Sequence, residues 1–99
     1  MAFGVTCTFD LKNASRTDYE NAYADLARIG LKKTVLASSG SHVVAPTTMT
    51  IGEFNGGSAE AVRDDVRAKV QAAFTARRLT SEIFVFVGGQ SWTWAGATT

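Results

Sequence analysis

The 99-residue chain has little of the reactive chemistry that often defines a small protein, since it contains one cysteine, one histidine and one proline. The single cysteine, Cys7, excludes an intrachain disulfide framework and any multi-cysteine metal site. Because Cys7 stands among alternating apolar residues, we interpret it as a buried hydrophobic side chain rather than a reactive thiol. His42 has no recognisable spacing to a serine or an acid, so we interpret it as structural or exposed rather than as a base or metal ligand.

The chain also lacks an excess of charge of one sign and any long hydrophobic run. Ten basic and nine acidic residues leave a net charge of +1, so binding to nucleic acid would need a local basic patch. The apolar runs are far shorter than a membrane span, and the N-terminal residues do not have the pattern of a secretory signal. We therefore expect one globular domain over residues 1–99, cytoplasmic and without a membrane partner.

Three stretches have the pattern of β-strands. Phe3, Val5, Cys7 and Phe9 alternate with small or hydroxyl residues, which predicts a strand with one face in the core, ending at Asp10. Residues 48–54 alternate in the same way, with threonines on one face, and residues 82–87 form the most apolar strand. A further strand is expected within residues 34–44, interrupted or bulged at the serine-rich stretch 38–41, and residues 45–47 are expected to turn.

Two stretches have helical periodicity. The first is predicted over about residues 18–29, with Thr17 and Glu20 as its capping box and Gly30 at its left-handed end. The second begins after Ser58, a good N-cap residue, and ends near Arg77 and Arg78. Its apolar residues recur at intervals of three or four, as an amphipathic helix requires. We interpret residues 55–58 as a turn and cap, with an anion site at the helix N-terminus as the alternative.

The order strand, helix, strand, strand, helix, strand is that of the split βαβ plan. Right-handed crossovers leave few other ways to fold this order. The sequence therefore predicts an α+β, ferredoxin-like βαββαβ sandwich, in which two helices cover one face of an antiparallel sheet. Residues 90–99 are expected to form an extended C-terminal tail.

The last strand has apolar side chains on both faces, which is unusual for a sheet covered by helices on one side. Phe84 and Phe86 point away from the face that the other apolar residues of this strand occupy, and the tail adds Trp92 and Trp94. A monomer rarely exposes so large an apolar patch. We predict a homodimer with these four residues in its interface, the tail lying across or joining the partner's sheet. The alternative is that the tail folds back over its own sheet.

Several short motifs together resemble the small CRISPR-associated Cas-two family and its stand-alone relatives, including virulence-associated protein D. They are Phe9-Asp10-Leu11, Asp18-Tyr19, the helix through Leu26 and Gly30, residues 58–63, residues 82–87, and Trp94-Ala95-Gly96. The resemblance covers most of the chain and implies a ferredoxin-like homodimer. In some members of the family it implies a metal-dependent ribonuclease or deoxyribonuclease, and in others an architectural role.

Asp10 is the residue to which the resemblance assigns catalysis and metal binding. In a dimer, two Asp10 carboxylates would share Mg²⁺ or Mn²⁺, which takes its other ligands from water and substrate phosphate. The alternative is a turn aspartate that accepts hydrogen bonds from backbone amides. Candidate phosphate contacts are Lys12, Arg16, Arg77 and Arg78, with Lys32 and Lys33 as a second basic pair. Solvated cations at helix ends are the alternative for the arginine pair.

Three functional hypotheses follow, and the sequence leaves open whether the chain is an enzyme. The favoured one is a non-catalytic homodimeric module of Cas-two-like type that binds a protein or nucleic-acid partner. The alternative is a metal-dependent endonuclease that cleaves RNA or DNA through paired Asp10 carboxylates. A third is a module that binds a small ligand, since this fold supports many functions.

Overall fold

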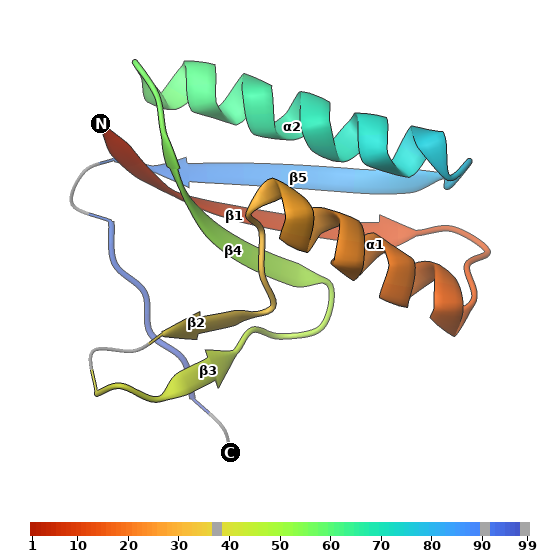
Figure 1. Cartoon of the computed structure of the whole chain (residues 1–99), viewed down its shortest axis with the longest axis horizontal. Coiled ribbons are helices and arrows are strands. Elements are labelled where there is room, and N and C mark those ends of the chain that lie inside the picture. Colours follow the sequence, from red (N-terminus) through yellow and green to blue (C-terminus); the bar gives the residue numbers. More distant parts are fainter. Residues whose placement is uncertain (37–38, 90–91, 98–99) are drawn as a thin grey trace.

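The protein is a flat α+β molecule in which two helices pack on a three-stranded antiparallel sheet, with a separate β-hairpin beside it (Figure 1). The structure is a computed structural model and describes residues 1–36, 39–89 and 92–97. In chain order the elements are β1 (Ala2–Leu11), α1 (Arg16–Ile29), β2 (Thr34–Leu36), β3 (His42–Val44), β4 (Met49–Asn55), α2 (Ala59–Ala76) and β5 (Ser81–Gly88). Within the described ranges, neither helix is long and apolar enough to cross a membrane.

The sheet has the order β4-β1-β5, with β1 antiparallel to both neighbours. Cys7 of β1 lies opposite Thr50 of β4 and Val85 of β5, so these three side chains share one face. The alternation predicted for all three strands is confirmed. The threonine face of β4 is the buried one, and the Thr50 hydroxyl donates a hydrogen bond of 3.1 Å to the Cys7 carbonyl.

Both helices cover the same face of the sheet, as predicted. The core contains five side chains of β1, two of α1, Leu31, and the apolar stripe of α2, namely Phe3, Val5, Cys7, Phe9, Leu11, Ala22, Leu26, Leu31, Val62, Val66, Val70 and Phe74. Phe9 is central to the aromatic part of this core, with its ring 5.2 Å from that of Phe74 and 5.6 Å from that of Tyr23 between centroids. Burying each large side chain of this kind contributes about 1.5–3 kcal/mol to folding.

The first helix begins two residues earlier than the sequence pattern predicted. Ser15, not Thr17, is the N-cap, and Ser15 with Asp18 forms the capping box that was assigned to Thr17 and Glu20. Both pairs have the required spacing, so the local pattern could not choose between them. In the observed register the Tyr19 hydroxyl hydrogen-bonds the Leu11 backbone, a contact between helix and strand that local sequence does not reveal. The predicted left-handed end of α1 at Gly30 is confirmed, with φ of 112°.

The segment 34–44 is not a strand of the main sheet. It forms two short strands, β2 and β3, which pair with each other around a turn containing Gly40, whose φ is 91°. A single bridge between Lys32 and Ile51 joins this part of the chain to β4. The first residue of the bulge expected at residues 38–41, residue 38, lies outside the described ranges. The described residues therefore contain five strands where the sequence pattern predicted four, because residues 34–36 and 42–44 pair with each other.

Candidate functional site

The face of the sheet opposite the helices is the main candidate surface. Phe84 of β5 lies opposite Thr8 of β1, and Phe86 lies opposite Thr6, so these side chains alternate with the buried residues of their strands. The side chains of Phe84 and Phe86 are 65% and 64% exposed. The prediction that these two rings point away from the helices is confirmed. They form an apolar ridge that no described part of the chain covers.

The C-terminal segment covers the other end of this face. Gly4 of β1 and Gly88 of β5 are directly opposite each other, and a Cβ atom added at either would collide with the side chain of Trp92. Because neither glycine has a side chain, the two leave a flat surface on which the indole ring of Trp92 packs; we call this surface the Trp92 seat. Trp94 lies farther along, where it lines a small apolar hollow between β4 and the β2–β3 hairpin together with Val43. Figure 1 shows this segment passing beside the hairpin.

The four predicted interface residues therefore separate into two pairs. Phe84 and Phe86 are exposed, whereas Trp92 and Trp94 pack against their own chain and are half-buried. This intramolecular packing is the alternative that the sequence left open for the tail. Whether the indole rings also meet a partner stays a prediction.

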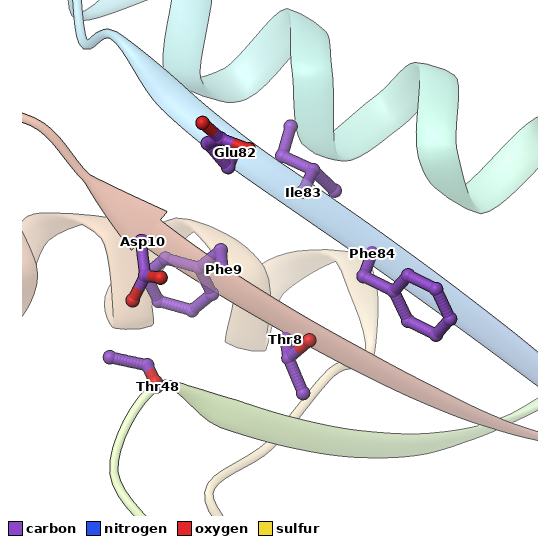
Figure 2. Close-up of a pocket in the computed structure, with 7 residues that line it drawn as sticks. All are labelled: Thr8, Phe9, Asp10, Thr48, Glu82, Ile83 and Phe84. Carbon is purple, nitrogen blue, oxygen red and sulfur yellow. The ribbon is translucent and has the colours of Figure 1, made fainter.

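We call the face of the sheet opposite the helices the open face. Asp10 lies on this face, at the opposite end from Trp92. Its neighbour across the β1–β5 pair is Glu82, so the two acidic residues occupy adjacent positions on one face of the sheet. Both line a hollow of about 250 Å³ that also includes the hydroxyl residues Thr8 and Thr48 and the ring of Phe84 (Figure 2). The sequence pattern did not identify Glu82 as a companion of Asp10. The sequence signal that could have identified it is the spacing of two residues between Glu82 and Phe84, which places both side chains on the same face of β5.

The environments of the two carboxylates differ. Lys12 lies 3.2 Å from Glu82 in an exposed ion pair, so this predicted phosphate contact already has an acidic neighbour. Within the described residues, the Asp10 carboxylate makes no hydrogen bond or ion pair, including the backbone contacts that the turn interpretation requires. Like charges directly opposite one another destabilise a strand pair. Asp10 is therefore available to a cation.

The predicted arginine contacts lie at the same end of the molecule, where β1 ends, α1 begins and α2 ends (Figure 1). Arg77 makes two hydrogen bonds to Asp25 of α1, so its guanidinium already has a carboxylate partner. Arg78 follows in a left-handed conformation with φ of 58° and is exposed. Arg16, in the first turn of α1, lies 3.4 Å from Glu20, and its side chain is 95% exposed. The structure gives Arg77 a structural role, whereas Arg16 and Arg78 are both exposed.

Three other candidates were interpreted as structural in the sequence. Cys7 is fully buried, and its burial raises the thiol pKa to about 11, which makes the reactive thiolate rare at neutral pH. His42 is exposed on β3. Ser58 caps α2 by accepting a hydrogen bond of 3.1 Å from the Ala61 amide. Each of these placements agrees with the structural interpretation.

Among the described residues, no three histidine, cysteine or acidic side chains gather closely enough to hold a metal ion by themselves. Asp10 and Glu82 supply two carboxylate groups, which suits Mg²⁺ only when water and substrate phosphate complete its octahedron. Comparison with protein-family models, with curated protein sequences and with solved structures gave no significant match in any of the three.

Proposed function

We propose that the chain is a non-catalytic homodimeric module that binds a protein or nucleic-acid partner, with the open faces of two sheets forming the dimer interface. The observation that supports this most is the exposure of Phe84 and Phe86 on a strand whose other face belongs to the core. Exposed aromatic side chains that are grouped on one sheet face are typical of protein–protein interaction sites. A second copy can cover both rings at once, since a two-fold axis places the same patch on each side.

The dimensions of the molecule are consistent with a second copy of the chain packing on the open face. The chain measures 36 × 36 × 19 Å, because it has one layer of helices and one layer of sheet. A broad face of this kind can supply the roughly 800 Å² per partner that a standard interface buries. Two such sheets pack face to face about 10 Å apart. In the proposed dimer, the sheet of the second copy would cover the open face of the first.

The finer fold assignment that we propose is ferredoxin-like. The order β5-β1-β4 matches three of its four strand positions, and the fourth position, beside β4, is taken by the bridge between Lys32 and Ile51 and by the hairpin that follows. This arrangement supports the resemblance to the Cas-two family as an evolutionary hypothesis. In that view the β2–β3 hairpin is a replacement for a longer second strand.

Light scattering on the purified chain tests the dimer. We expect a dimeric mass for the wild type and a monomeric mass after Phe84→Thr with Phe86→Thr, since threonine retains β-propensity while it removes the rings. Val44→Thr is a matched control, because Val44 is 70% exposed but lies on the hairpin. A monomeric wild type, or a dimer that survives the double substitution, would refute the proposed interface.

The pairing of Asp10 with Glu82 favours a second candidate, the metal-dependent endonuclease. A Mg²⁺ or Mn²⁺ ion held there would activate water and neutralise phosphate, while Thr8 and Thr48 line the same hollow. Cleavage of RNA and DNA by the wild type, Asp10→Asn and Glu82→Gln, each with and without the metal, tests it. Metal-dependent cleavage lost in Asp10→Asn supports the nuclease, and equal residual activity in all three proteins indicates a contaminant.

A further inference from the structure

A second hollow lies beside α1. It measures about 400 Å³, within the range of small-ligand sites, and its lining residues are Arg16, Tyr19, Glu20, Tyr23 and Lys33. Two cations and two tyrosine rings therefore share one concave surface. Neither the dimer nor the carboxylate pair of Asp10 and Glu82 uses these residues.

The positive charge of this hollow is accessible. Lys33 is exposed and, within the described residues, makes no ion pair with a carboxylate. Among the described residues, the ion-pair partner of Arg16 is Glu20, at 3.4 Å and with both side chains largely exposed, an arrangement that contributes little to stability in water. Lys12 and Arg77, by contrast, contact Glu82 and Asp25. A phosphate group arriving here would meet two cations and displace at most one weak ion pair.

The tyrosine rings are held rigidly. The Tyr23 hydroxyl accepts a hydrogen bond of 2.6 Å from the Thr48 amide, and the Tyr19 hydroxyl bonds both backbone groups of Leu11. Behind them, the Phe9 ring packs against both. The Lys33 ammonium lies 4.5 Å from the centroid of the Tyr23 ring, so a cation and an aromatic surface are already adjacent. Rings fixed in this way lose little entropy when a ligand packs on them.

We propose that this hollow binds a nucleotide unit of single-stranded nucleic acid, with the phosphate between Arg16 and Lys33 and the base against the tyrosine rings. Basic grooves lined with aromatic side chains bind single strands in this manner, because every base has a face that can stack and every unit carries a phosphate. The two cations outnumber the one carboxylate of the hollow, Glu20, so the hollow is locally basic in a chain that is nearly neutral. This inference names the partner class within the proposed binding module and does not depend on the dimer.

Fluorescence anisotropy with labelled oligouridylate and oligothymidylate tests the site. We expect the wild-type chain to bind at least one of them more tightly than about 10⁻⁴ M, with affinity that falls as salt rises from about 50 to 200 mM. Lys33→Glu should weaken binding about tenfold, and Lys33→Ala should lower the slope of log affinity against log salt by about 0.7. Arg16→Ala should have a similar effect on the slope.

Lys69→Ala provides the matched control, since Lys69 is an exposed lysine of α2 that pairs with Asp65. It should leave binding unchanged, and circular dichroism should show that every variant is folded. Light scattering on the same samples separates the two proposals: Lys33→Glu should keep the wild-type mass, and the Phe84 and Phe86 double variant should keep its oligonucleotide affinity. Absence of binding to both oligonucleotides, or equal binding by the wild type and Lys33→Glu, would overturn the site.

Discussion

Arg77, the residue that ends α2, is joined to Asp25 in α1 by two hydrogen bonds, 2.5 Å from Nε to Oδ2 and 3.0 Å from Nη2 to Oδ1. Arg28, one turn along α1, donates a further hydrogen bond of 2.7 Å to the same carboxylate. The Asp25 side chain is 13% exposed, so it is the most enclosed acid among the ion pairs of the described residues. This contact joins the two helices through a charged pair.

Removing this carboxylate should reduce stability in a pH-dependent way. The hydrogen bond from Arg77, followed by the charges of Arg77 and Arg28, lowers the pKa of Asp25 below its ordinary value. A lowered folded-state pKa contributes stability above the unfolded value of about 4, and that contribution is lost as the pH falls through the folded value. We expect Asp25→Asn to cost about 1 kcal/mol near neutral pH and progressively less below pH of about 4.

Urea unfolding at neutral and acidic pH measures that difference. Asp65→Asn is the control, because Asp65 is exposed and pairs only with Lys69 within its own helix. A deficit in Asp25→Asn that is the same at both pH values would contradict the assigned role of the carboxylate.

The position of Trp92 against Gly4 and Gly88 can be tested by adding a side chain at Gly4. Gly4→Ala places a methyl group where the indole lies, so the ring should be displaced toward solvent at a cost of about 1–3 kcal/mol. Tryptophan emission, measured in a Trp94→Phe background, should shift to longer wavelength. Gly57→Ala should change neither emission nor stability by much, because nothing lies within 4 Å of a Cβ atom there. Unchanged emission in Gly4→Ala would show that Trp92 does not occupy this seat.

Cys7 should be protected from thiol reagents in the folded state. It is fully buried, and burial raises its pKa to about 11, so both access and thiolate are lacking. We expect modification by an aromatic disulfide reagent to proceed only as fast as the chain unfolds, and to become rapid in denaturant. Fast labelling of the native protein would contradict the position of Cys7 in the core.

Thr50 is the one buried polar side chain among the described residues, and two substitutions separate its methyl group from its hydroxyl. Thr50→Val retains the shape but leaves the Cys7 carbonyl without this donor, so it should cost about 1 kcal/mol. Thr50→Ser retains the hydrogen bond but leaves a methyl-sized void, which should also cost about 1 kcal/mol. Denaturant midpoints for the two variants measure these effects. If Thr50→Val proves as stable as the wild type, the hydrogen bond contributes nothing to folding.

Local pattern was sufficient for the elements whose neighbours in sequence define them. The alternation from Phe3 to Phe9 requires a strand with one buried face, and the stripe from Val62 to Phe74 requires a helix with one buried side. Gly30 and Ser58 could be recognised because a left-handed end and an N-cap depend on single residue types. The start of α1 was misplaced because two overlapping capping boxes are equally good by local criteria.

The candidate sites depend on pairings that local pattern does not contain. Asp10 and Glu82 are separated by most of the chain and meet only through the register of β1 against β5. Arg16 and Lys33 line the same hollow because α1 ends at Gly30 and the chain that follows brings Lys33 beside Tyr23. The same is true of Trp92, whose seat requires Gly4 and Gly88 to be opposite each other.

Side-chain periodicity was sufficient to predict which faces of the strands and helices are apolar, because it follows directly from backbone geometry. It therefore predicted an α+β sandwich with Phe84 and Phe86 on the face away from the helices. The folded arrangement was needed to show that residues 34–36 and 42–44 form a separate hairpin and that Trp92 lies on its own sheet. It also decided which cations have carboxylate partners. These outcomes depend on contacts between residues far apart in the chain, where several arrangements satisfy the same local pattern and packing selects one of them.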